Sequence, residues 1–148
     1  MTATLRTLTA NDSEAVEQVR QFFRNYAAWL GVDLSFQNFD QEMASLPGAY
    51  ATPQGRLFLA DVDGRAAGCV GVRPLPDSEG VCEMKRLYVD PEFRGMGVGR
   101  ELALAAINAA KAIGYRRLLI DTLPSMRMAV KLYRELGFTE APAYYKTP

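Results

Sequence analysis

The chain has 148 residues, with 17 Lys and Arg balanced by 17 Asp and Glu, two cysteines and no histidine. This length fits one domain with a sizeable core, so we expect residues 1–148 to form a single domain. A formal charge of zero argues against nucleic-acid binding, which needs a concentrated surplus of basic residues. The absence of histidine excludes a Ser-His-Asp triad, a Cys-His pair and a His-ligated zinc site.

The cysteines and the apolar segments limit the class of protein further. Cys69 and Cys82 are too few for a disulfide framework or a four-cysteine metal site, and we interpret them as small buried residues. No metal is expected. The amino terminus lacks the apolar core of a signal peptide, and the apolar stretch at residues 102–113 is too short to cross a bilayer. We therefore expect a cytoplasmic protein that does not bind membranes.

The first part of the chain favours a short strand followed by two helices. A strand is predicted at residues 4–8, and capping residues at 11–14 begin a helix that Gly31 ends. A second helical stripe, at residues 36–46, ends at Pro47-Gly48. Apolar side chains of the first helix recur at steps of three and four, which predicts one buried stripe: Val16, Val19, Phe23, Tyr26 and Leu30.

The rest of the chain changes to strand periodicity and back. Strands at residues 56–62, 65–72 and 81–89 are predicted as an antiparallel meander, with Asp63-Gly64 as a hairpin turn. A helix ended by Gly114, a buried strand and a last helix ended by Gly137 follow, at residues 98–113, 117–122 and 124–136. The order of strand, two helices, three antiparallel strands, helix, strand and helix predicts an α/β fold with a mixed sheet.

A glycine-rich turn at residues 94–100 joins the third meander strand to the next helix. Its three glycines lack Cβ atoms, so the backbone can approach a ligand closely, and the first amides of the helix suit a phosphate. Arg94 and Arg100 add positive charge. Arg100 stands where a dinucleotide fingerprint would need glycine, and no Gly-Lys-Ser/Thr triplet of a nucleotide P-loop occurs. A turn that only caps the helix is the structural alternative.

Two segments carry a family resemblance. Arg94-x-x-Gly97-x-Gly99, after the strand at residues 83–89, resembles the acyl-CoA-binding motif of the GNAT N-acetyltransferase superfamily. Residues 129–138 resemble that family's second characteristic segment, at the usual separation. The resemblance implies a GNAT-like mixed central sheet and direct transfer of an acetyl group from acetyl-CoA to a primary amine of a small molecule or peptide.

The resemblance also implies which residues hold the coenzyme. Backbone amides of the turn would hold the pyrophosphate of coenzyme A, and two splayed parallel strands would hold its pantetheine arm. The amide of Val89 would donate to the thioester carbonyl. The coenzyme-binding residues implied in this way are Leu87, Tyr88, Val89, Arg94, Gly95, Met96, Gly97, Val98, Gly99 and Arg100.

Two further side chains occupy the family's catalytic positions. Tyr133 takes the place of the general acid, since a phenol stays protonated at neutral pH; a core tyrosine is the alternative. Glu83 takes the place of the base that deprotonates the amine, often through water; a solvated or ion-paired glutamate beside Lys85 and Arg86 is the alternative. Simple alternation puts Glu83, Lys85, Leu87 and Val89 on one face, but the family usually has a bulge in this strand that breaks it.

The acceptor pocket is expected from the first helices and their loop. Tyr26, Trp29, Asp33 and Phe36 are the expected substrate-binding residues, with Phe39 and Met84 near them; ordinary core aromatics are the alternative. The sequence does not name the acceptor amine.

Two departures from the family pattern lie near the carboxyl end. Met126 stands where relatives often carry an asparagine that fixes the coenzyme arm, so Ser125 would replace that contact or the contact would be lost. The chain also stops where relatives continue into a last strand, so we expect this strand to be absent or the chain to end before it. The resulting sheet edge favours a homodimer.

Two other functions remain open at this point. One is a non-catalytic acyl-CoA-binding regulatory module, and the other is a protein N-acetyltransferase.

Overall fold

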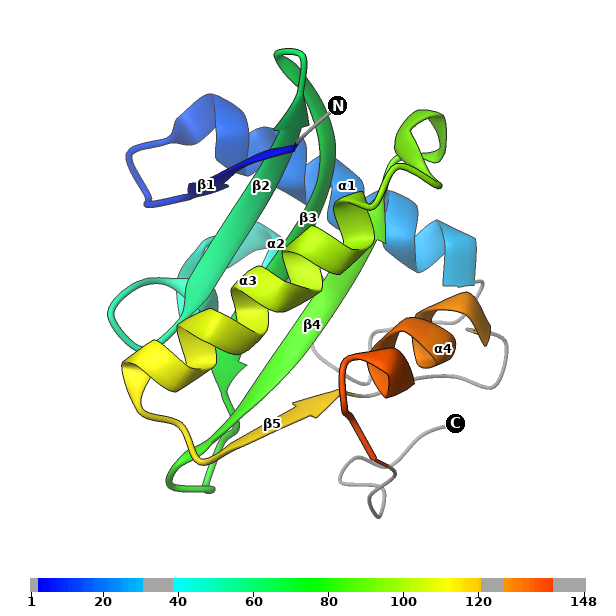
Figure 1. The fold of residues 1–148 in the computed structure, drawn as a ribbon. Helices are drawn as coiled ribbons and strands as arrows, with labels where there is room; N and C mark the ends of the chain where they lie inside the picture. The colour runs from blue at the N-terminus through cyan, green and yellow to red at the C-terminus, as the bar shows by residue number, and fades with distance from the viewer. Residues whose placement is uncertain (1–2, 31–38, 121–126, 140–148) are drawn as a thin grey trace.

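The computed structural model describes residues 3–30, 39–120 and 127–139 of the chain. These residues form a five-stranded sheet in the order β1-β2-β3-β4-β5 (Figure 1). Antiparallel pairing joins the first four strands, and β5 runs parallel to β4, so the sheet is mixed as predicted. The strands are β1 (Thr4–Thr7), β2 (Arg56–Val62), β3 (Arg65–Pro74), β4 (Val81–Val89) and β5 (Arg117–Ile120).

Helices cover both faces of this sheet. Helix α3 crosses one face, and α1 lies behind the opposite face (Figure 1). Helix α4 packs with α3, whereas α2 and η2 pack with α1. The helices are α1 (Ser13–Leu30), α2 (Phe39–Ser45), η2 (Gly48–Tyr50), η3 (Pro91–Phe93), α3 (Val98–Ile113) and α4 (Arg127–Glu135). The predicted α/β fold and the order of its elements are confirmed.

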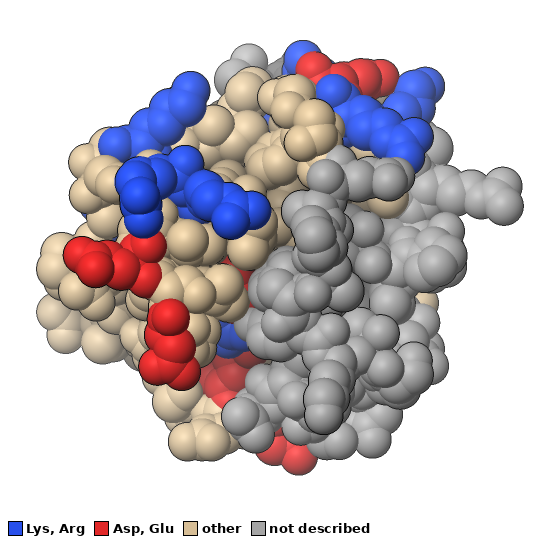
Figure 2. All heavy atoms as spheres, turned by 90° about the horizontal axis from the view of Figure 1, so that it is seen from below, with Lys and Arg blue, Asp and Glu red and all other residues tan. Residues whose placement is uncertain are grey.

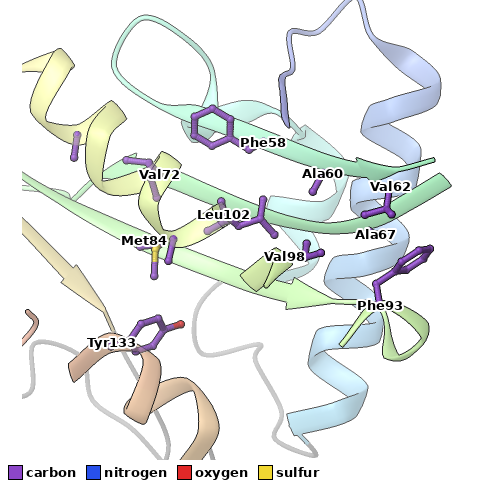
Figure 3. Packing of buried hydrophobic residues seen from close by; sticks show 14 of the residues in the cluster. Phe58, Ala60, Val62, Ala67, Val72, Met84, Phe93, Val98, Leu102 and Tyr133 are labelled. Carbon is purple, nitrogen blue, oxygen red and sulfur yellow. The ribbon is translucent and has the colours of Figure 1, made fainter. Parts of the chain in front are cut away.

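Strand alternation divides the core into two clusters. Leu57 and Leu59 of β2 pack toward α1 and α2, whereas Phe58 and Ala60 pack toward α3. Figure 3 shows the second cluster, in which Leu102 of α3 lies over the sheet. Burying one such large apolar side chain stabilises the fold by roughly 1.5–3 kcal/mol. Both cysteines are buried and unbridged, as predicted.

A bulge in β4 reverses its alternation. Arg86 has a φ of 61°, and the register with β3 shifts between Cys69 and Gly71. Before the bulge Met84 packs on the α3 side, and after it Tyr88 packs on the α1 side. The expected bulge is therefore confirmed, and simple alternation does not hold across this strand. As a consequence, Arg86 lies on the same face as α2.

The predicted boundaries agree with the structure within a few residues. Strand β3 runs to Pro74 rather than to residue 72, and α2 ends at Ser45 rather than at residue 46. Gly31, the predicted end of the first helix, lies outside the described residues. So do residues 121–126, where a strand end and a helix start were predicted. Within the described ranges, no helix combines the length and apolarity needed to cross a bilayer.

Candidate active site

The glycine-rich turn presents bare backbone at the amino end of α3. Gly95 and Gly97 both have a φ of 81°, in the left-handed region, and a Cβ added to either would meet nothing within 4 Å. Gly97 is the N-cap residue, and the first helical bond runs from Glu101 N to Gly97 O at 3.1 Å. The amides before Glu101 therefore have no partner within the helix, and the open space lies beside them. A Cβ on Gly99 would lie 3.5 Å from a methyl of Val89, which is an ordinary van der Waals contact.

Two exposed arginines flank the turn, as predicted. The Arg94 Nε donates to the carbonyl oxygen of Val89 at 3.0 Å, and its guanidinium lies 5.7 Å from the ring centres of Trp29 and Tyr88. Arg100 lies 3.5 Å from a carboxylate oxygen of Glu135 on α4. Between them, Met96 is half-buried and Val98 is buried under the turn. Arg94 thus ties α1 to the turn through Trp29, which is 52% exposed.

The parallel pair of strands separates before β4 ends. Pairing of β4 with β5 runs from Val81 opposite Arg117 to Met84 opposite Ile120. Within the described residues, the remainder of β4 has no strand partner on that side. Leu87 and Val89 lie half-buried against the α3 cluster in this part of the strand, and Tyr88 is buried on the opposite face. Of these three residues, Tyr88 and Val89 contact the glycine turn through Arg94.

Tyr133 lies on α4 with its ring in the core. It is 6% exposed, and its ring contacts Phe138 edge to face at 5.9 Å. Figure 3 shows its hydroxyl pointing away from α4. Burial raises the pKa of the phenol well above its ordinary value, and the nearby Tyr26 phenol raises it further. Tyr26 belongs to the layer on the opposite face of the sheet, so the two layers approach each other near Tyr133.

Glu83 is a fully buried carboxylate near the start of β4, between β3 and β5 in the sheet. It lies opposite Arg73 of β3, whose Nε donates to Glu83 Oε1 at 3.1 Å. The Lys85 ammonium is 4.0 Å from Oε2. The ion pair considered as an alternative for Glu83 is therefore present, with Arg73 rather than Arg86 as the hydrogen-bonded partner.

A second buried carboxylate, Glu42 of α2, was missed in the sequence. Arg86 approaches it with Nε and Nη2 at 3.2 and 3.1 Å, and Arg73 Nη1 lies at 3.3 Å. The Tyr50 hydroxyl also donates to Glu42 at 2.9 Å. Burial and then Glu42 raise the pKa of Tyr50, so this phenol stays protonated. Glu42 lies 31 residues from Arg73, and nothing in the local pattern of α2 signals the contact.

Aromatic side chains surround the buried arginine. The guanidinium of Arg86 lies 5.9 Å from the ring centre of Tyr26 and 5.4 Å from that of Phe39. Tyr26 in turn lies 6.2 Å from Trp29. Tyr26 is buried in the α1 cluster, whereas Trp29 is 52% exposed. Four other predicted site residues lie outside the described residues: Asp33, Phe36, Ser125 and Met126.

Charges of both signs lie on the face of the molecule that Figure 2 shows. Figure 2 shows Lys and Arg in groups at the upper left and upper right, and Asp and Glu mainly at the left and the bottom. On this face the charged side chains of the described residues thus lie in small groups of either sign.

Comparison with known proteins identifies the family. The family model of the Acetyltransferase (GNAT) family matches residues 15–138. The chain belongs to the GNAT acetyltransferase family. It is 39% identical to an uncharacterized N-acetyltransferase of Schizosaccharomyces pombe, over 90% of this chain and 82% of that protein. It is 31% identical to another from Dictyostelium discoideum, over 91% and 90% of the two chains. The predicted family and enzyme class, an N-acetyltransferase, are confirmed.

Solved GNAT structures share the fold. Aminoglycoside N-acetyltransferase AAC(6')-Iy in complex with CoA gives a TM-score of 0.73 at 23% identity, over 99% of this chain and 95% of that chain. A predicted acetyltransferase with acetyl-CoA from Clostridium acetobutylicum gives 0.75 at 12% identity, over 99% and 96%. At these identities, the likeness is one of fold.

Proposed function

We propose that this chain transfers an acetyl group from acetyl-CoA to a primary amine of a small molecule or peptide. The observation that carries the proposal is the open turn at Gly95 and Gly97 in a chain of this family. The turn suits a diphosphate, because helix-end amides without a helical partner lie beside the open space at Gly95 and Gly97, and an exposed arginine flanks the turn on each side. The description of two similar structures as complexes with CoA or acetyl-CoA supports the same co-substrate.

The proposed chemistry assigns one proton transfer to each of two side chains. Acetyl-CoA supplies the thioester, whose C–S bond breaks as a C–N bond to the amine forms. Glu83 accepts the proton that leaves the amine nitrogen, directly or through water, and Tyr133 donates its phenolic proton to the departing sulfur. The amide of Val89 donates to the carbonyl oxygen while negative charge develops there. The raised pKa of Tyr133 keeps its proton in place before the transfer.

The remaining site residues belong to this proposal in the same roles. Leu87, Tyr88 and Val89 would bind the pantetheine arm, and Ser125 and Met126 would contact its end. Tyr26, Trp29, Asp33 and Phe36 would form the acceptor side. Trp29 supports this assignment, because a large exposed aromatic beside the turn is available to a ligand.

Thermal unfolding with and without acetyl-CoA tests the proposal. A ligand at 100 times its Kd adds about 2.7 kcal/mol of stability. At about 2–4 °C per kcal/mol, we expect acetyl-CoA to raise Tm by several degrees, whereas NAD and ATP leave it unchanged. A panel of amines, assayed by release of free thiol, then seeks the acceptor. An unchanged Tm with acetyl-CoA would contradict the proposal, and binding without turnover on any amine would favour the regulatory module.

A further inference from the structure

We propose that Arg73 is a positioning residue that holds the carboxylate of Glu83. We also propose that Glu42 of α2 shares the positive charge of Arg73 with Glu83. The inference rests on the proposed role of Glu83 as the base. It assigns a function in the reaction to two side chains outside both family motifs, one on β3 and one on α2.

The backbone fixes the first contact. Arg73 and Glu83 are directly opposite in the antiparallel register of β3 and β4, and Nε lies 3.1 Å from Oε1. The carboxylate of Glu83 is 0% exposed and the Arg73 side chain 15%. A buried carboxylate is costly unless a charged donor compensates it, so removal of Arg73 would change both the orientation and the protonation of Glu83.

Glu42 holds the other end of the same guanidinium. Arg73 Nη1 lies 3.3 Å from Glu42 Oε1, and its guanidinium carbon lies 5.7 Å from the ring centre of Tyr50. Arg86 donates to both oxygens of Glu42, and Tyr50 donates to one of them. The guanidinium of Arg73 thus contacts Glu83, Glu42 and the ring of Tyr50, and these three contacts hold it in place against Glu83.

Charged and titratable groups approach Glu83 from several elements. Arg73 and Lys85 contact its two oxygens, and Glu42 and Arg86 lie one contact further away. Cys82 is its neighbour along β4; burial and then Glu83 raise the pKa of this thiol to about 12, so it is uncharged. Among the described residues, Tyr50 contacts Glu42 and Tyr26 contacts Arg86.

These charges predict opposite effects for two substitutions. Without the positive charge of Arg73, the carboxylate of Glu83 takes up a proton more readily, and activity is lost at a higher pH. Without the negative charge of Glu42, Glu83 holds a proton less readily, and activity persists to a lower pH. A purely structural role for either residue would lower activity at every pH without moving the profile.

The experiment measures kcat/KM from pH 5.5 to 9.5 for wild type, Arg73→Gln, Arg73→Lys and Glu42→Gln. The control is Arg6→Gln, which removes one positive charge from an exposed pair with Asp61 at the far edge of the sheet. We expect Arg73→Gln to move the acidic limb up by about one pH unit or more, with KM for acetyl-CoA unchanged. Arg73→Lys should restore part of this shift, Glu42→Gln should move the limb down, and Arg6→Gln should match wild type.

An acidic limb that stays in place in Arg73→Gln, with activity lowered equally at every pH, would overturn the inference. If Arg73→Gln does not fold, the other two variants decide, and an upward or absent shift in Glu42→Gln overturns it. If the wild type binds and turns over acetyl-CoA but no variant moves the acidic limb, this inference is wrong and the proposed function still stands. A wild type without turnover on any amine removes the proposed function as well.

Discussion

Tyr133 is a single side chain whose surroundings favour a proton donor. Because burial raises its pKa, the phenol keeps its proton through pH 10, and we expect no alkaline loss of activity from Tyr133 below that pH. Tyr133→Phe removes only the hydroxyl and keeps the ring against Phe138. We predict a fall in kcat of about 100-fold, the low end for general acid catalysis, with KM for acetyl-CoA nearly unchanged. Steady-state kinetics and a pH profile measure both effects.

Tyr115 provides the matched control for this prediction. Its hydroxyl donates to the backbone carbonyl of Gln54 at 2.6 Å, in a contact between loops away from the turn. Tyr115→Phe should therefore leave kcat at the wild-type value. Equal activity of the Tyr133→Phe and wild-type enzymes would show that Tyr133 is a core tyrosine and not the general acid.

Helix α3 carries glycines of the same conformation at its two ends, and only one end adjoins the proposed coenzyme site. Gly97 has a φ of 81° and Gly114 a φ of 109°, each with open space where a Cβ would lie. Alanine at either position should cost about 1–2 kcal/mol of stability, since left-handed backbone disfavours a side chain. We predict that Gly97→Ala also weakens acetyl-CoA binding by about tenfold or more, because the added methyl either shifts the glycine-rich turn or fills the open space beside it. Urea unfolding and ligand titration of both variants measure the two effects.

The comparison with Gly114→Ala separates strain from binding. This variant should lose similar stability and keep the wild-type Kd for acetyl-CoA. If both variants lost affinity equally, general destabilisation of α3 would explain the weaker binding, and the glycine-rich turn at its amino end would not.

The elements that the sequence predicted well are those whose ends depend on the local residue pattern. Gly97 and Gly114 mark the ends of α3, and Asp63-Gly64 marks the β2–β3 turn, because each position adopts a positive φ. The site's buried charges were less accessible to prediction. The pairing of Glu42 with Arg86 joins residues 44 apart, and it requires the bulge at Arg86, which a non-glycine residue forms with a φ of 61°. Such contacts depend on register and packing between elements rather than on spacing along the chain.

At the scale of the whole molecule, buried thiols and phenols couple stability to pH. Burial raises the pKa of Cys82 from 9.0 to about 12, and it also raises the pKa values of Cys69, Tyr50 and Tyr133. The unfolded chain therefore releases these protons at lower pH than the folded chain. Where the folded state binds more protons, stability falls as pH rises. We expect full stability from these groups below about pH 8, and a progressive loss above pH 9 as the unfolded thiols and then phenols ionise.

Cys82→Ala measures the share of one thiol in this loss. Each extra proton that the folded state holds steepens the fall by at most about 1.4 kcal/mol per pH unit. At pH 7 the variant should differ from wild type by a constant packing loss, because the thiol is protonated in both states. Above pH 9 its free energy of unfolding should fall less steeply than that of wild type, as determined by urea unfolding under reducing conditions. Parallel curves up to pH 11 would show that Cys82 ionises as readily in the folded chain as in the unfolded chain, so that burial in β4 does not hold its proton.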